Sequence, residues 1–210
     1  IGADSQILTS DSEKPVWTNP AAAGGGMWSL LSRTAVTDSD VTAVAFTDDS
    51  WSSFDAIRVT VDGWKHVDSG DGNEQFIVRI SKDGGSNYDS GGSYKFVVNS
   101  LQGDSTLIRK DVNQQTASSG NTGLMLAGAT LSTYLTNHMA EFTITNPSDS
   151  SEISIMEWTS SAVFSTSDDP FVSHGAGYWD SVDNISGLQF KTYNGQETTG
   201  VFSLWGRVKS

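Results

Sequence analysis

Short runs of alternating apolar and polar residues recur along most of this chain, and tight-turn signals separate them. In the run 75–81, Phe76, Val78 and Ile80 share one side, while Ile77 and Arg79 share the other. A period of two is typical of β-strands that bury one face. About a dozen such runs at short, even spacing predict one domain of antiparallel β topology, at the spacing expected of sandwiches and barrels.

The expected strands follow one another closely along the chain. They cover residues 27–33, 41–47, 54–64, 75–81, 94–98, 106–109, 124–127, 140–145, 152–163, 175–179, 185–193 and 200–208. The segment 131–138 is interpreted as a helical turn. The Asn194-Gly195 pair lies between two apolar runs, which predicts that the strands 185–193 and 200–208 pair as a hairpin.

Charge and length limit the kinds of partner. The 210 residues are enough for one domain with its own core, and the absence of cysteine excludes disulfides. The formal net charge of −13 would repel phosphate backbones, so no nucleic-acid partner is expected. No apolar stretch reaches the length of a membrane span, so no membrane insertion is expected. The acidity itself is interpreted mainly as a contribution to solubility.

The first 26 residues differ in composition from the rest. They contain Pro15 and Pro20 and end in an alanine and glycine run at 21–26, which predicts an extended arm followed by a flexible joint. Trp17 favours an arm that docks on a partner over a free tail, because a free indole leaves apolar surface in water. The sandwich is expected to span 27–210. The start at Ile1 leaves open whether the chain is processed or part of a longer product.

One turn carries a recognisable pattern. The segment 81–88 reads SKDGGSNY and resembles the Asp-box of sialidases and other β-rich secreted proteins. The resemblance implies a hairpin turn without catalytic function, in which Ser81, Asp83, Gly85 and Tyr88 are structural. An aspartate can accept backbone N–H groups there while glycine takes the tight conformation.

Two acidic loops are weak candidates for Ca²⁺. Asp68, Asp71 and Asn73 bring oxygen donors close together, but Arg79 stands where a bidentate glutamate would be needed in an EF-hand. A solvated hairpin loop is the preferred interpretation, and the acidic corner at 168–170 is interpreted in the same way. No cofactor is expected.

The three histidines do not predict an enzyme. His66, His138 and His174 are far apart, and the nucleophile-elbow, zincin and Walker motifs are all missing. A triad can assemble from distant residues, so a polysaccharide lyase or esterase remains a third hypothesis. No catalytic residue is assigned.

Aromatic residues provide the candidates for binding. Of the seven tryptophans, Trp51 and Trp179 have neighbours typical of loops or strand ends, and Tyr178 adjoins the second. With Trp17, these residues are proposed as interaction sites, because exposed aromatic rings stack on sugars or anchor interfaces. Core packing is the competing interpretation for Trp51 and Trp179.

Several segments together resemble structural proteins of tailed-bacteriophage virions, of the tail-fibre, minor-tail and head-decoration type. These segments read MWSLLS at 27–32, FDAIRVTV at 54–61, RISKDGGSNYDSG at 79–91, ISGLQF at 185–190 and GVFSLWG at 200–206. Leu188 and Trp205 depart from the family's usual Ile and Tyr. The resemblance implies a jelly-roll-like sandwich on the outside of a virion, no catalytic residues, and a symmetric oligomer.

The expected function is therefore that of a non-enzymatic structural protein on the virion surface, anchored by residues 1–26. The expected partners are other capsid or tail proteins, further copies of the chain (with a trimer favoured), and a glycan of the host surface. The alternative is a carbohydrate-binding module of a secreted protein, which rests on Trp51, Trp179 and the acidic loops.

Overall fold

The computed structural model describes residues 7–11, 14–18, 27–37, 41–66, 76–91, 93–103, 108–115, 123–126, 135–164, 170–193, 195 and 197–209. In this part of the chain, the regular elements are β-strands and one short 3-10 helix, η2 (Asp49–Ser53). The all-β class expected from the alternating pattern is thus confirmed. Within the same residues, no helix has the length and apolar character needed to cross a bilayer.

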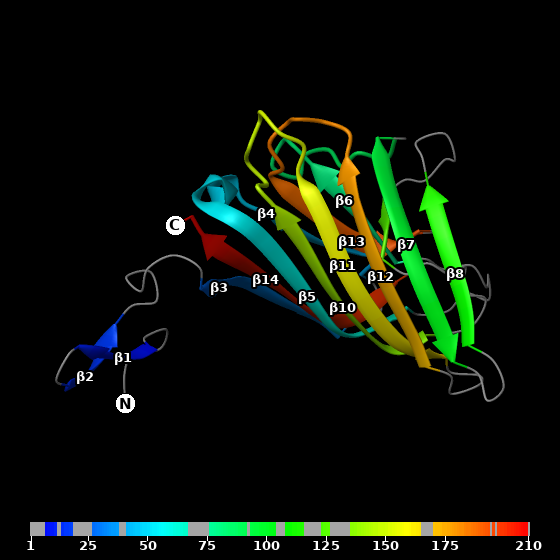
Figure 1. Ribbon diagram of the computed structural model, residues 1–210, viewed down its shortest axis with the longest axis horizontal. Helices are drawn as coiled ribbons and strands as arrows, with labels where there is room; N and C mark the ends of the chain where they lie inside the picture. Colours follow the sequence, from blue (N-terminus) through cyan, green and yellow to red (C-terminus); the bar gives the residue numbers. More distant parts are fainter. Residues whose placement is uncertain are drawn as a thin grey trace.

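Two antiparallel sheets form the body of the molecule (Figure 1). Side by side, the large sheet contains β3 (Trp28–Val36), β14 (Thr198–Val208), β5 (Phe54–His66), β10 (Leu135–Thr145), β11 (Ile155–Phe164), β12 (Pro170–Trp179), β7 (Tyr94–Gly103) and β8 (Ile108–Gln115). The small sheet contains β4 (Ala43–Thr47), β13 (Gly187–Thr192), β6 (Phe76–Ser81) and β9 (Leu124–Met125).

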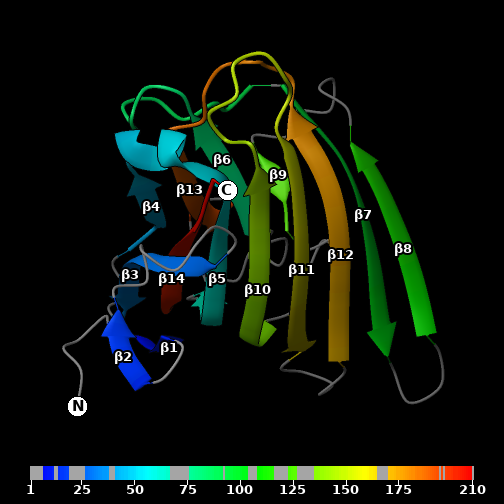
Figure 2. The same ribbon diagram turned by 60° about the vertical axis from the view of Figure 1, so that its left-hand side comes forward.

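The strand order is that of a jelly roll with an extension. Eight strands remain when β1, β2, β7, β8, β11 and β12 are left out. Numbered in chain order, the first, eighth, third and sixth of these lie side by side in the large sheet. In the small sheet, the second, seventh, fourth and fifth of these strands lie side by side in that order. The strands β7, β8, β11 and β12 come from two insertions that continue the large sheet beyond β10, and Figure 2 shows them side by side. The jelly-roll-like sandwich predicted from the sequence is confirmed.

The N-terminal arm contains a short hairpin. β1 (Ile7–Asp11) pairs with β2 (Lys14–Thr18), and neither joins another of the described strands. In this hairpin the backbone of Trp17 lies opposite Leu8. The side chain of Trp17 is outside the described part of the structure, so its proposed docking role stays a prediction.

The core lies between the sheets and is rich in aromatic rings. The Phe76 ring stacks on Trp64 with 4.4 Å between centroids, and Phe190 and Phe202 pack around it at 6.1 and 6.4 Å. These residues come from β5, β6, β13 and β14, at positions where the alternation faces inward. Burial of large aromatic rings is a dominant stabilising contribution to such a core.

Two expectations about local structure are wrong. Strands 185–193 and 200–208 do not pair, because β13 joins the small sheet and β14 the large sheet. The chain between Thr192 and Thr198 crosses from one sheet to the other instead of closing a hairpin. The second error concerns 131–138, because residues 135–138 belong to β10, in which Leu135 pairs with Phe164 and His138 with Trp64, whereas 131–134 lie outside the described residues.

Candidate functional site

A row of polar side chains crosses the face of the large sheet that points away from the small sheet. Thr60 lies opposite Glu141, Glu141 opposite Thr159, Thr159 opposite His174, and His174 opposite Asn99. The row therefore crosses β5, β10, β11, β12 and β7 at right angles to the chain direction. At the usual strand spacing it extends over about 19 Å.

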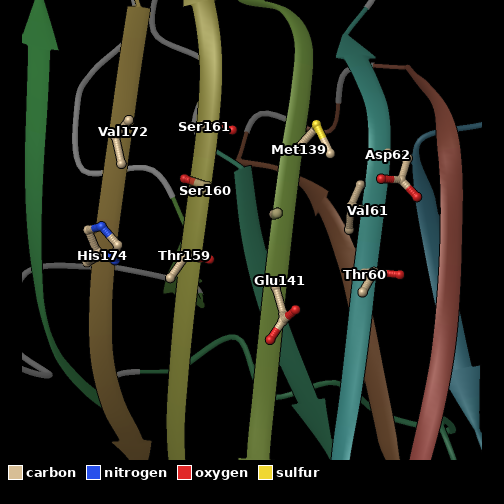
Figure 3. A pocket seen from close by; sticks show the side chains of 11 residues that line it. Thr60, Val61, Asp62, Met139, Glu141, Thr159, Ser160, Ser161, Val172 and His174 are labelled. Atoms are coloured by element: carbon tan, nitrogen blue, oxygen red, sulfur yellow. The ribbon is translucent and has the colours of Figure 1, made fainter. Parts of the chain in front are cut away.

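The row lies along a shallow groove, which we call the outer groove. One hollow of about 390 Å³ is lined by Thr60, Val61, Asp62, Met139, Ala140, Glu141, Thr159, Ser160, Ser161, Val172 and His174. A second, of about 370 Å³, is lined by Arg58, Glu141, Thr143, Glu157, Trp158, Thr159, His174, Gly175 and Ala176. Because Glu141, Thr159 and His174 line both, the two hollows form one groove across β5, β10, β11 and β12 (Figure 3).

The groove combines hydrogen-bonding and apolar surface. Four polar side chains in the groove are at least partly exposed. They provide the hydroxyls of Thr60 and Thr159, the carboxylate of Glu141 and the imidazole of His174. Met139 is 54% exposed at the edge of the same hollow. Hydroxyl and imidazole groups both donate and accept hydrogen bonds, so the surface can match a ligand with many hydroxyl groups.

Two arginines and a tryptophan form a cluster at the β3 side of the groove. The guanidinium carbon of Arg58 lies 4.1 Å from the ring centroid of Trp28, and its Nε is 3.2 Å from Glu141 Oε1. Arg207 lies 5.7 Å from the same ring and pairs with Asp55 at 2.6 Å. The cation–π contact and the ion pair hold the Arg58 side chain in place beside the groove.

Trp205 lies next to this cluster. Its indole nitrogen donates a hydrogen bond to Thr60 Oγ1 at 3.3 Å, and it is the cross-strand neighbour of Arg58. The side chains of Trp28 and Trp205 are half-buried, so part of each is accessible. Sequence reasoning did not select either of them, because both lie in runs that predict strands and were interpreted as packing residues.

The Asp-box-like segment forms a closed turn after β6, but not the expected hairpin turn, because β6 and the next strand, β7, lie in different sheets. Asp83 Oδ1 accepts hydrogen bonds from Ser81 Oγ at 2.7 Å and from the Asn87 backbone at 2.8 Å, and Oδ2 accepts one from Asn87 Nδ2 at 2.7 Å. These donors, led by the Asn87 side chain, lower the pKa of Asp83 to about 2. Gly85 has a φ of +85°, and a Cβ there would overlap the Thr47 side chain.

The same turn is tied to the inserted strands. Tyr94 on β7 accepts a hydrogen bond from the Ile80 backbone at 3.0 Å and donates one to the Asp89 carbonyl at 2.8 Å. Burial raises the pKa of the Tyr94 hydroxyl. Lys82 pairs with Asp183 at 2.8 Å. The turn therefore joins the extension of the large sheet to the jelly roll.

The proposed binding aromatics occupy different surroundings. Trp51 is 1% exposed and belongs to the core, and Trp179 is 6% exposed with its indole hydrogen-bonded to Asp89. The expectation that these two rings present an exposed face is wrong, because the sandwich covers them. Tyr178 is half-buried on β12, with Lys95 5.6 Å from its ring centroid.

The two histidines whose side chains the structure describes, His138 and His174, do not share a site. His138 is buried beside the rings of Trp64 and Phe76, whereas His174 lies on the opposite face in the outer groove. The His66 side chain and the candidate calcium residues Asp68, Asp71 and Asn73 lie outside the described residues, as do 168 and 169. Among the described residues, no three His, Cys, Asp or Glu side chains are arranged to hold a metal ion.

Comparisons with known proteins give little further information. No family model matches the chain, and no curated protein matches it. Among solved structures, the CBM2 module of the evolved Dit of Lactobacillus casei BL23 phage J-1 aligns with 88% of this chain and 81% of that chain. The identity is 9% and the TM-score is 0.22, which are too low to indicate a shared fold or function.

Proposed function

We propose that this chain is a non-enzymatic domain on the surface of a tailed-phage virion and that its outer groove binds a host saccharide. The observation that carries the binding role is the groove across β5, β10, β11 and β12, with its row of polar side chains. The virion assignment rests on the motif resemblance of the segments between residues 27 and 206.

The chemistry of the groove favours a sugar over other ligands. A pyranose ring has hydroxyl groups at its rim and C–H groups on its faces. Thr60, Thr159 and Glu141 can bond the hydroxyl groups, while Met139 and Val172 offer apolar contact. The groove is open and shallow, so it can take part of a long polymer whose ends lie beyond the protein.

A non-catalytic role is supported by the positions of the candidate catalytic side chains. His138 and His174 lie on opposite faces of the sheet, so they cannot act on one substrate. The Asp-box-like turn uses Asp83 to hold its own backbone, which is a structural task.

Two measurements test the proposal. Antibodies against the domain should label the surface of purified virions in electron microscopy, and the purified domain should bind polysaccharide from host envelopes in a pull-down without shortening it. Glutamate substitution at the groove, Glu141→Gln, should weaken this binding, while Glu152→Gln on the exposed 152–153 segment should not. Binding without any virion labelling would instead favour the carbohydrate-binding module of a secreted protein.

A further inference from the structure

We propose that the outer groove takes an uncharged polysaccharide whose chain crosses the strands, and that the indole of Trp205 stacks on a sugar ring at the β14 end of the groove. This inference rests on the proposed saccharide binding and adds the direction of the chain, its charge class and the anchoring residue.

The direction follows from the register of the large sheet. Polar side chains repeat once per strand along the row from Thr60 to Asn99 and so form a line perpendicular to the strands. On one side of this line, the row from Met139 through Ser161 and Val172 to Leu101 is mostly apolar. On the other side, the row is polar over β5, β10 and β11 and ends in the apolar Ala176 and Val97, so the line itself is the one that stays polar across all five strands. A polymer with regularly spaced hydroxyl groups therefore finds its donors and acceptors by crossing the strands.

Trp205 lies on β14 one outward-facing position from Ser203, the residue opposite Thr60 at which this line reaches β14. Its hydrogen bond to Thr60 Oγ1 at 3.3 Å places the indole beside the first member of the row. That bond holds the orientation of the ring before any ligand arrives. A partly exposed, pre-oriented tryptophan gives a large contact area at a small cost in side-chain entropy.

The charges of the groove disfavour acidic polymers. Asp62, Glu141 and Glu157 line it, and the cation beside them, Arg58, is paired with Glu141. The whole chain has a formal net charge of −13. Uronate, sulfate or phosphate groups would meet repulsion from the groove and from the rest of the molecule, whereas a neutral hexose chain would not.

The test uses the full chain in native gels containing soluble polymers. The neutral polymers are mixed-linkage β-glucan, galactomannan, dextran, glycogen and neutral polysaccharide from bacterial envelopes. The acidic polymers are polygalacturonate and heparin, and the cationic polymer is chitosan. We expect retardation by at least one neutral polymer and by neither acidic polymer. Oligosaccharides of the retarding polymer should bind more tightly with each added ring until the row is filled, and then level off.

Three variants test the anchor, each after a circular dichroism check of folding. Trp205→Ala should weaken binding about tenfold or more, as expected for a tryptophan anchor. Trp205→Phe keeps an aromatic face and should lose only a few-fold. Tyr193→Ala is the control, since Tyr193 is an exposed aromatic residue that follows β13 of the small sheet and does not line the groove, and the affinity of this variant should be unchanged.

The outcomes separate this inference from the proposed function. Binding mainly to acidic polymers or to chitosan, or equal affinity in Trp205→Ala and the unaltered chain, overturns the inference and leaves saccharide binding in place. The absence of binding to every polymer overturns both. If Trp205→Ala does not fold, the affinity of Trp205→Phe is decisive. The stacking role is contradicted if this variant loses more than tenfold in affinity, and also if it loses none.

Discussion

The indole N–H of Trp179 donates a hydrogen bond to Asp89 Oδ2 at 2.6 Å, although 90 residues separate the two in the chain. Trp179 ends β12, the inserted strand next to β7, and Asp89 follows the Asp-box-like turn of the small sheet. Nearby, the Asp180 backbone bonds the Ser93 carbonyl at 2.7 Å. This corner therefore holds the end of the extension against the jelly roll.

Removal of the Trp179 donor should destabilise the fold. In Trp179→Phe the Asp89 carboxylate keeps its bond from the Gly91 backbone but loses the indole. We expect the free energy of unfolding to fall by about 1.5–3 kcal/mol, the usual range for a hydrogen bond to a charged group. Urea unfolding followed by circular dichroism measures this loss. The exposed pair of Lys82 and Asp183 gives the control, since Lys82→Met should cause no measurable loss. Equal losses in both variants would contradict the role of the Trp179 bond.

The Asp83 turn should make the stability depend on acid. The pKa of Asp83 is about 2 in the folded protein, because Asn87 and Ser81 donate hydrogen bonds to it, and about 3.9 in an unfolded chain. A folded-state pKa below the unfolded value stabilises the fold above pH 4, and this contribution is lost as the pH falls to 2. Asp83→Asn should therefore flatten the decline in stability between pH 4 and 2.

The measurement is a series of urea unfolding curves across this pH range. Glu152→Gln serves as the control, because Glu152 lies exposed outside the turn, and its profile should follow that of the unaltered chain. A decline of the same slope in Asp83→Asn would show that other carboxylates cause the acid sensitivity.

Local alternation made much of the fold predictable. In β6, the positions of Phe76, Val78 and Ile80 are predicted to face inward, and all three are buried in the core. Ile77, which is predicted to face outward, is buried as well. The sequence also contains the turn residues from Ser81 to Tyr88, whose contacts are local and depend mostly on neighbours within seven positions. Patterns of this range can be read without knowledge of the rest of the chain.

The position of Trp28 beside the groove could not be found in this way. The pairing of β3 with β14 shifts between Leu204 and Trp205, so that Leu31 is an extra residue in β3. A bulge reverses which side chains face outward, and Trp28 therefore lies on the outer face near Arg58 and not in the core. Simple alternation from Val36 backwards would place Trp28 inside.

The sheet that each of the last two strands joins could not be predicted from the sequence either. Asn194-Gly195 indicates a reversal of the chain, and Gly195 does have a φ of +74°. The turn residues do not decide whether the next strand stays in the same sheet. That choice depends on β4, β6, β3 and β5, which already flank the places that β13 and β14 fill.

A buried pair of serines offers a test of hydrogen bonding inside the extension. Ser100 on β7 and Ser173 on β12 lie directly opposite, with 3.2 Å between their hydroxyl oxygens, and both are buried. Ser173→Ala should cost about 1–2 kcal/mol of unfolding free energy, because the Ser100 hydroxyl loses this partner. The double variant with Ser100→Ala should regain most of that loss. Thermal and urea unfolding would measure it, and additive losses would contradict the coupling.

The packing of Trp158 against Gly175 gives a prediction of unusual sign. Alanine normally stabilises a strand relative to glycine by about 0.5–1 kcal/mol. A Cβ on Gly175 would overlap the indole of Trp158 on the cross-strand neighbour, so we expect Gly175→Ala to lower the unfolding free energy by about 1–3 kcal/mol. The smaller ring in Trp158→Phe should make room for the added Cβ. The double variant should therefore lose less unfolding free energy than the two single variants lose together. Ala176→Ser on the outer side is the control and should change little, whereas a gain of stability in Gly175→Ala would exclude this contact.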